Sequence, residues 1–261
     1  MTGPRPKKRF GQHFLHDRNV IGRIVAALAP RPDDHVVEIG PGKGALTREL
    51  ATHLPHFDAV ELDRDLLAHL PSVIPPDKLT LHGADALEYD FCQLVQKGRK
   101  LRLVGNLPYN ISTPLLFHLL DQASCIQDML FMLQKEVVQR LAASPGGKDY
   151  GRLSVMIQYR CSVEKLFEVA SGAFTPPPKV DSAMVRLVPL AAPPVAINDE
   201  AQFARVVRTA FASRRKTLRN NMKGLLSAED MTALGIDPTR RAETLSLAEF
   251  AVLSNAIPSV L

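Results

Sequence analysis

Short apolar runs alternate with segments of helical spacing through the first half of the chain. The runs fall at residues 35–39, 58–62, 79–82, 101–105 and 129–133. Before them, residues 17–29 carry apolar side chains at helical spacing, with Asp17 or Asn19 as the expected N-cap. A strand followed by a helix, repeated every 20 to 30 residues or so, is typical of βαβ units. The pattern therefore predicts a parallel sheet with helices on both faces.

Two further strands and a change of pattern follow. The runs 163–169 and 182–188 flank Phe174-Thr175-Pro176-Pro177-Pro178-Lys179, whose three prolines exclude a sheet ladder and predict a loop. Ala191-Ala192-Pro193-Pro194 is typical of a linker, and residues 203–211 beyond it carry an apolar helical stripe. We therefore predict an α/β domain with a mostly parallel seven-stranded sheet at 1–190 and a small all-helical domain at 191–261.

The composition is that of an ordinary soluble protein. Hydrophobic residues make up 46% of the 261 and charged residues 23%, and no run approaches the ~18 consecutive apolar residues of a membrane span. The basic start lacks the apolar stretch of a secretion signal, so we expect a cytoplasmic protein. The three cysteines, Cys92, Cys125 and Cys161, are widely spaced and predict buried reduced thiols, with neither a disulfide nor a metal site.

The formal net charge of +5 is distributed unevenly. Residues 1–16 and 201–223 hold 11 of the 32 basic residues and no acid, which leaves 21 basic residues against 27 acids elsewhere. Two concentrated basic segments suit a polyanion such as RNA, although a solvated helix face and a loose terminus are the plainer alternative. The candidate RNA-binding residues, expected on a basic helix, are Arg214, Arg215, Lys216 and Arg219.

A glycine turn follows the first predicted strand. Gly40-Pro41-Gly42-Lys43-Gly44-Ala45 stands where a strand ends and a helix begins, and its glycines would let the backbone approach a nucleotide-like cofactor. Glu61 ends the second strand, where its carboxylate could accept both hydroxyls of a ribose. Asp85, after the third strand, could accept an adenine amine, cap the next helix, or do both. This pattern alone leaves a nicotinamide dinucleotide and S-adenosylmethionine open.

Asn106-Leu107-Pro108-Tyr109 follows the fourth run and narrows the chemistry. The lone pair of an aromatic amine is delocalised into the ring, so an enzyme must orient that amine. The Asn106 side-chain oxygen and the Leu107 carbonyl could accept the two amine hydrogens and aim the lone pair at a donor methyl. Tyr109 would stack on an unpaired base. Phe174 is the candidate for the opposite face of that base, with a core position under the loop as the alternative.

Six segments in order resemble the ribosomal RNA adenine dimethyltransferases of the KsgA (RsmA) type, over nearly the whole chain. They are Lys8-Arg9-Phe10-Gly11-Gln12-His13-Phe14-Leu15, Glu38-Ile39-Gly40-Pro41-Gly42, Glu61-Leu62-Asp63, Gly105-Asn106-Leu107-Pro108-Tyr109-Asn110-Ile111-Ser112, Leu133-Gln134-Lys135-Glu136-Val137 and Phe174-Thr175-Pro176-Pro177-Pro178-Lys179-Val180-Asp181-Ser182. The resemblance implies a monomeric enzyme of Rossmann-like fold with a role in small-subunit biogenesis. It would transfer four methyls from S-adenosylmethionine to two adjacent adenosines in the 3′-terminal hairpin loop of small-subunit ribosomal RNA.

The same resemblance implies which residues contact the cofactor, His13 and Leu15 through their backbone. The full set is His13, Leu15, Gly40, Glu61, Asp85 and Asn106. Three alternatives stay open: a ribosome-assembly factor that binds RNA and whose catalysis is secondary, a methyltransferase of large-subunit ribosomal RNA, and a nicotinamide dehydrogenase. The proline-rich loop and the Arg214-Arg215-Lys216 segment favour the small-subunit enzymes.

Overall fold

The computed structural model describes residues 4–7, 10–96 and 98–258, so Lys8 and Arg9 of the first motif lie outside the described residues. The chain divides into two compact units. The first comprises the chain up to Val138 together with Glu164–Pro189, and the second comprises Gln139–Val163 together with the chain from Leu190 on. This division differs from a single boundary at residue 191, because one internal segment groups with the C-terminal part.

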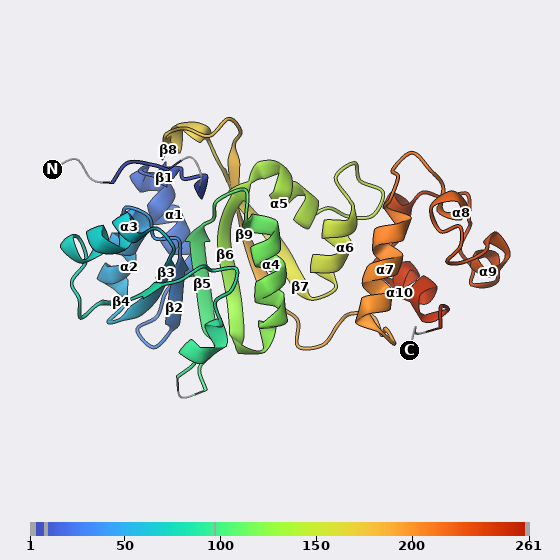
Figure 1. Ribbon diagram of the computed structural model, residues 1–261, viewed down its shortest axis with the longest axis horizontal. Coiled ribbons are helices and arrows are strands. Elements are labelled where there is room, and N and C mark those ends of the chain that lie inside the picture. The colour runs from blue at the N-terminus through green and yellow to red at the C-terminus, as the bar shows by residue number, and fades with distance from the viewer. Residues whose placement is uncertain (1–3, 8–9, 97, 259–261) are drawn as a thin grey trace. The chain divides into compact units, whose positions relative to one another are not determined.

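A seven-stranded sheet organises the first unit (Figure 1). Its strands are β2 (His35–Ile39), β3 (Phe57–Glu61), β4 (Leu79–Gly83), β5 (Leu101–Asn106), β6 (Ile126–Gln134), β7 (Cys161–Val169) and β9 (Ser182–Pro189). Their order is β4-β3-β2-β5-β6-β9-β7. The five strands from β4 to β6 pair in parallel, and β9 runs antiparallel to β6. The predicted mostly parallel sheet is confirmed.

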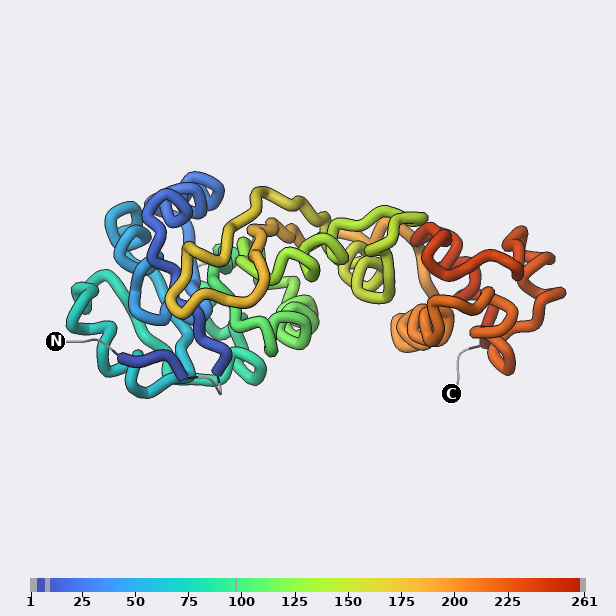
Figure 2. Tube along the Cα trace, turned by 90° about the horizontal axis from the view of Figure 1, so that it is seen from above, coloured from blue at the N-terminus to red at the C-terminus, as the bar shows by residue number. Residues whose placement is uncertain are grey.

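Helices cover both faces of this sheet, with α1 and α2 on one side and α4 on the other (Figure 2). The helices of this part are α1 (Arg18–Leu28), α2 (Ala45–His53), α3 (Arg64–His69) and α4 (Ser112–Asp121), and α5 (Lys135–Leu141) spans the boundary between the two units. Asp17 caps α1 by accepting from the backbone N–H groups of Asn19 and Val20, as predicted. The strands between the two helix layers are apolar along most of their length, because side chains on both of their faces are buried.

A short antiparallel ribbon joins the N-terminal motif to the proline-rich loop. It consists of β1 (Phe14–Leu15) and β8 (Phe174–Thr175), with Phe14 opposite Thr175 and Leu15 opposite Phe174. The three prolines lie beyond the ladder, and the Thr175–Pro176 peptide bond is cis. The loop prediction is thus confirmed from Pro176 onward, and the two residues before it form a strand.

The second unit has its own core of buried side chains. Its helices are α6 (Arg152–Gln158), α7 (Glu200–Ala210), α8 (Leu218–Asn221), α9 (Ala228–Ala233) and α10 (Leu247–Asn255). Tyr150, Val155 and Tyr159 share this core with Phe203 of α7, which explains why the segment around α6 groups with the C-terminal part. Among the residues that the structure describes, no helix is long and apolar enough to cross a membrane.

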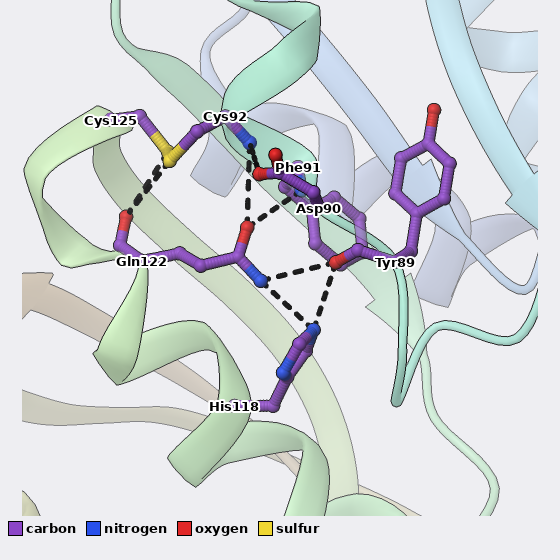
Figure 3. Close-up of a disulfide and its surroundings, with 7 residues drawn as sticks. All are labelled: Tyr89, Asp90, Phe91, Cys92, His118, Gln122 and Cys125. Atoms are coloured by element: carbon purple, nitrogen blue, oxygen red, sulfur yellow. Dashed lines mark hydrogen bonds between the residues drawn. A yellow bond between two sulfur atoms is a disulfide. The ribbon is translucent and has the colours of Figure 1, made fainter.

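Cys92 and Cys125 form a disulfide, so the prediction of three reduced thiols is wrong for this pair (Figure 3). The two cysteines lie in the 3-10 turns Phe91–Leu94 and Ala123–Cys125, 33 residues apart. These turns precede the adjacent strands β5 and β6, whose starts meet at one edge of the sheet. Cysteine spacing along the chain does not reveal such a meeting. Cys161 is a buried free thiol, and burial raises its pKa to about 12.

Candidate active site

A pocket opens in the first unit at the carboxyl ends of β2, β3, β4 and β5. Parallel strands deliver their carboxyl ends to the same edge of a sheet, which is where open α/β folds bind ligands. The lining comes from the N-terminal motif, the glycine turn, the two strand-end acids and the Asn-Leu-Pro-Tyr segment. It consists of Phe10, Gly11, Gln12, His13, Phe14, Ile39, Gly40, Gly42, Val60, Glu61, Leu62, Leu66, Ala84, Asp85, Ala86, Asn106, Leu107, Pro108, Tyr109, Asn110 and Ile111.

The glycine turn forms one wall of the pocket. Gly40, Gly42 and Gly44 have φ angles of 70°, 57° and 79°, a left-handed conformation that residues with a Cβ rarely adopt. Gly105 of β5 is needed for a different reason, since a Cβ there would lie 2.3 Å from the carbonyl oxygen of Ile39. The close approach of β2 and β5 that it permits brings the glycine turn beside Asn106.

Glu61 is held at the end of β3 with its carboxylate against the glycine turn. Its Oε2 accepts from the N–H of Gly42 at 3.2 Å, and its Oε1 accepts from the N–H of Asp63 at 2.9 Å. Burial raises the pKa of this carboxyl, and the backbone donors oppose that rise. Leu62 beside it is 47% exposed, which leaves an apolar side chain uncovered within the pocket. A strand-end carboxylate with spare lone pairs next to an apolar surface suits a ribose joined to a flat base.

Asp85 caps a turn, as one of its two predicted roles requires, and it also lies in the lining of the pocket. Its Oδ1 accepts from the backbone N–H of Leu87 at 2.9 Å, so it caps the turn after β4. It also lines the pocket between Ala84 and Ala86. The capping bond fixes the side chain, and the second carboxylate oxygen can accept an amine such as that of adenine.

Asn106 ends β5 with its side-chain orientation determined by its neighbour. Nδ2 donates to the backbone carbonyl oxygen of His13 at 2.8 Å. Since a carbonyl oxygen only accepts, the nitrogen of the amide must face His13, and Oδ1 remains as an acceptor. Leu107 donates its N–H to the carbonyl of Met132 at 3.2 Å, which ties the tetrapeptide to β6. Tyr109 is half-buried and its ring stacks against that of His13, with 5.7 Å between ring centroids.

The N-terminal motif, residues 10–15 of the described chain, is bound to the end of β3 by contacts that were not predicted from the sequence. Gln12 Nε2 donates to Asp63 Oδ2 at 3.0 Å, and the Lys7 ammonium forms ion pairs with Asp63 and Asp65. Burial acts to raise the pKa of Asp63, but the hydrogen bonds from Lys7 and Gln12 outweigh it and hold that pKa below its usual value. Gln12 and Asp63 both belong to segments that carry the family resemblance. That membership was the one sequence feature that could have marked them as site residues.

Two predicted site residues lie outside the main pocket. Leu15 is buried and lines a smaller adjoining pocket with Glu38, Gly40 and Asn106. Phe174 lines neither pocket, because its pairing with Leu15 places it in the apolar core of the first unit, where it is 2% exposed. The structure therefore corrects the stacking role predicted for Phe174 and shows the alternative, a core anchor under the proline-rich loop.

Glu38 is a buried acid that the sequence analysis did not single out for chemistry. It lies on β2 beneath the glycine turn, and its Oε2 has no hydrogen-bond partner among the described residues. Burial raises its pKa to about 8, the nearby Glu61 carboxylate adds to the rise, and the Thr47 hydroxyl opposes it. Glu38 is therefore neutral over most of the physiological pH range.

The predicted RNA-binding residues are exposed in the second unit but do not form a basic helix. Arg214, Arg215 and Lys216 lie in the turn between α7 and α8, and Arg219 is on α8. The prediction of a basic helix is wrong for Arg214, Arg215 and Lys216, because α7 ends at Ala210 and its buried apolar stripe ends with it. The Arg214 guanidinium donates to the carbonyl oxygen of Lys148.

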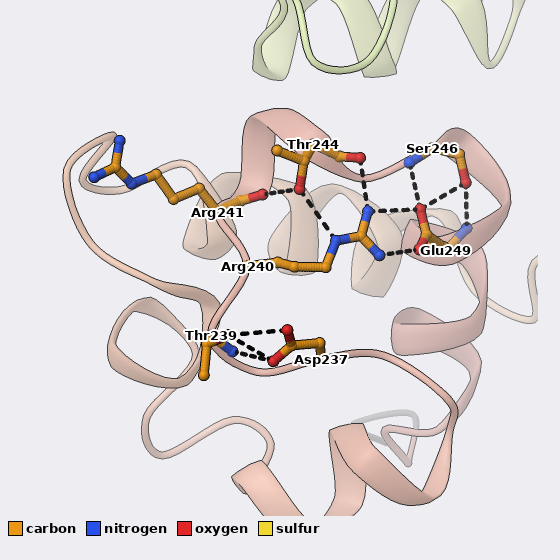
Figure 4. Close-up of polar contacts among 7 residues, drawn as sticks. All are labelled: Asp237, Thr239, Arg240, Arg241, Thr244, Ser246 and Glu249. Carbon is orange, nitrogen blue, oxygen red and sulfur yellow. Dashed lines mark hydrogen bonds and ion pairs between the residues drawn. The ribbon is translucent and has the colours of Figure 1, made fainter.

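The segment that contacts the start of α8 also contains an ion pair, formed by the Arg240 side chain (Figure 4). The Arg240 guanidinium pairs with Glu249, which also accepts from the N–H and hydroxyl of Ser246. The backbone carbonyls of Arg240 and Pro238 accept from the N–H groups of Leu218 and Arg219, at 2.8 and 3.0 Å.

Among the described residues, no cluster of His, Cys, Asp and Glu could hold a metal ion.

Comparison with known proteins identifies the family. The model of the ribosomal RNA adenine dimethylase family matches residues 3–258. The chain is 58% identical over 250 residues to the ribosomal RNA small subunit methyltransferase A of Laribacter hongkongensis, covering 96% of this chain and 95% of that protein. It is 57% identical over 254 residues to the protein of that name from Pseudomonas aeruginosa, covering 97% and 95%.

Solved structures agree with this result. The 23S rRNA methyltransferase ErmE superposes with a TM-score of 0.71 at 26% identity, covering 92% of this chain and 98% of that one. A dimethyladenosine transferase from Plasmodium falciparum has the same fold, with a TM-score of 0.75 at 24% identity, covering 92% and 96%. The chain therefore belongs to the ribosomal RNA adenine dimethylase family and is an S-adenosylmethionine-dependent methyltransferase.

Proposed function

We propose that this enzyme dimethylates the N6 amines of two adjacent adenosines in the 3′-terminal hairpin loop of small-subunit ribosomal RNA, as a monomer in the cytoplasm. The observation that carries the proposal is the hydrogen bond from Asn106 Nδ2 to the carbonyl of His13, which leaves the Asn106 oxygen as an acceptor at the end of β5. The names of the relatives, at 57 to 58% identity over almost their whole length, support the small subunit as the target.

The residues of the pocket fit S-adenosylmethionine. Glu61 is suited to the ribose hydroxyls, Asp85 to the adenine amine and the glycine turn to close backbone approach, with His13, Leu15 and Asn106 completing the predicted set. When bound, the cofactor supplies an activated methyl group. Asn106 lies beside Gly40 and so can take part in both binding and transfer.

The chemistry asked of the protein is orientation. An adenine amine has two hydrogens and a lone pair that is delocalised into the ring. The Asn106 side-chain oxygen and the Leu107 carbonyl oxygen would accept those hydrogens, so that the lone pair is localised and points to the methyl group. Tyr109 would stack on the base, which must be unpaired to reach the pocket. Transfer of the methyl would leave a positive charge on N6, and the acidic N–H of that product would lose its proton to water, so this arrangement requires no strong general base.

The second unit supports an RNA substrate through its exposed basic residues. Arg214, Arg215 and Lys216 sit in one turn and Arg219 on the following helix, where phosphates can reach them. Such contacts would hold the RNA without reading its sequence. A role limited to subunit assembly would use the same residues but would not need the pocket.

The experiment is methyl transfer from labelled S-adenosylmethionine to purified ribosomal subunits that lack adenine methylation. We expect label in N6,N6-dimethyladenosine at the 3′ end of the small-subunit RNA. Label confined to the large subunit would instead indicate a methyltransferase of large-subunit ribosomal RNA. RNA binding without any label would indicate a ribosome-assembly factor whose catalysis is secondary.

A further inference from the structure

The phenol oxygen of Tyr109 lies 2.7 Å from the hydroxyl oxygen of Ser182. Tyr109 is half-buried at the pocket, whereas Ser182 is 0% exposed and lines no part of it. Ser182 closes the proline-rich motif, and the proposed reaction gives it no role. A buried hydroxyl whose partner is a residue of the transfer site points to a supporting function.

The sheet fixes Ser182 relative to the transfer site. Ser182 begins β9 opposite Gln134 of β6, and Met132 of the same strand lies opposite Asn106 of β5. Leu107 also donates its N–H to Met132. The serine and the Asn-Leu-Pro-Tyr segment are therefore attached to three adjacent paired strands, so the Ser182 hydroxyl is a rigid reference point.

His13 gives the ring of Tyr109 a second support. The two rings stack at an interplanar angle of 28°, and His13 Nδ1 donates to the carbonyl oxygen of Pro176 at 2.8 Å. Burial raises the pKa of Tyr109, so its phenol keeps its proton at neutral pH. The phenol can then either donate a hydrogen bond to the serine hydroxyl or accept one from it. The Tyr109 side chain is thus held at two points, by His13 at one face of its ring and by Ser182 at its hydroxyl.

The geometry points to Ser182 as a positioning residue for methyl transfer, whose hydroxyl holds the Tyr109 ring in the orientation that receives the target adenine. This inference rests on the proposed function, in which Tyr109 stacks on that base. A ring that is already ordered loses less conformational freedom when the base arrives, so fixing it strengthens binding of the flipped base without touching the RNA. The cofactor end of the pocket does not depend on this bond.

A double-mutant cycle tests the inference, with Ser182→Ala, Tyr109→Phe and the double variant. Tyr109→Phe keeps the stacking ring and removes only the hydroxyl. We expect each single variant to lower kcat/KM for the small subunit about 5- to 10-fold, as for loss of one hydrogen bond. The double variant should be no worse than either single one, and the dissociation constant for S-adenosylmethionine should stay within about twofold of wild type. Ser254→Ala, a buried serine whose hydroxyl has no partner among the described residues, is the control.

A spectroscopic measurement without RNA separates this inference from the proposed function. The chain has 4 tyrosines and no tryptophan, so its near-ultraviolet circular dichroism contains a tyrosine band that no tryptophan obscures. Ser182→Ala should change the tyrosine band, and adding it to Tyr109→Phe should change nothing more. Losses of kcat/KM that multiply, or an unchanged tyrosine band in Ser182→Ala, would overturn the inference. If Ser182→Ala does not fold, wild-type kcat/KM in Tyr109→Phe overturns it as well. Absence of transfer by the wild-type enzyme would instead refute the proposed function and leave the tyrosine band as the test.

Discussion

The side-chain nitrogen of Asn106 donates to the backbone carbonyl of His13, 93 residues earlier in the chain. The contact joins the N-terminal motif to the end of β5 and decides which end of the amide is left to accept. His13 therefore sets the orientation of the Asn106 amide, and in the proposed reaction that orientation leaves Oδ1 to face the target amine. An aspartate at position 106 could not donate this bond, although it would still carry acceptor oxygens.

Asp63→Asn should weaken binding of S-adenosylmethionine. The Asp63 carboxylate is 2% exposed, accepts a hydrogen bond from Gln12 and forms an ion pair with Lys7. Removing its charge should therefore weaken the attachment of the N-terminal motif to the pocket. Asparagine keeps an oxygen to cap α3. We expect the dissociation constant, measured by calorimetry, to rise about tenfold. Asp65→Asn is the matched control, since that side chain is 66% exposed and should shift the constant less than about twofold. Equal effects of the two variants would refute the prediction.

Glu38→Gln should flatten the pH dependence of stability. The pKa of Glu38 is about 8 in the folded protein, raised by burial from 4.5. Between these values the unfolded chain is ionised and the folded protein is protonated, so stability falls as pH rises, by roughly 1.4 kcal/mol per unit, and levels off above pH 8 or so. Glutamine is neutral throughout. We expect urea unfolding at pH 5, 6.5 and 8 to show that the unfolding free energy of the variant, relative to wild type, increases as the pH rises. A difference between the two proteins that does not change with pH would contradict the raised pKa of Glu38.

Cys92→Ser should destabilise the first unit only under oxidising conditions. The disulfide spans a separation of 33 residues, and closing a loop of that length contributes about 4 kcal/mol to the unfolding free energy in the chain-entropy estimate. Denaturant unfolding should therefore separate variant from wild type without reductant and bring them together with it. Thiol titration of the unfolded oxidised protein should count the single thiol of Cys161. Three reactive thiols would show that the bond does not form.

Charge reversal at Arg214, Arg215 and Lys216 should weaken RNA binding whatever the RNA sequence. Contacts to phosphates release counterions, so losing three of them should reduce the slope of log affinity against log salt by about 2. Filter binding over a range of salt concentrations measures this slope. Lys100→Glu, an exposed reversal in the first unit, is the control. An unchanged slope in the triple variant would mean that these side chains are solvated and do not contact the RNA.

The sheet could be predicted from sequence because it depends on local patterns. Apolar runs at regular spacing predicted its strands, and Glu61, Asp85 and Asn106 could each be assigned to the end of one of them. The turn that contains Gly42 and Gly44 could be predicted from its place between a strand and a helix, and the structure adds that both glycines have positive φ angles.

Relationships that depend on tertiary pairing could not be predicted in this way. The Cys92–Cys125 bond forms because two turns precede neighbouring strands, and nothing in the cysteine spacing records that order. Phe174 lies in the core because β8 pairs with β1, a ribbon of only two residues per strand. The segment around α6 belongs to the second unit because Tyr159 packs on Phe203. The spacing of apolar residues within that segment does not predict this contact.

The single-turnover rate of Asn106→Ala at saturating S-adenosylmethionine is the most direct test of the central claim, that Asn106 orients the target amine. We expect the rate of methyl transfer to small subunits to fall at least 100-fold or so, as for loss of one transition-state hydrogen bond, while cofactor binding is weakened but measurable. Transfer at the wild-type rate, or a loss that saturating cofactor restores, would contradict the claim.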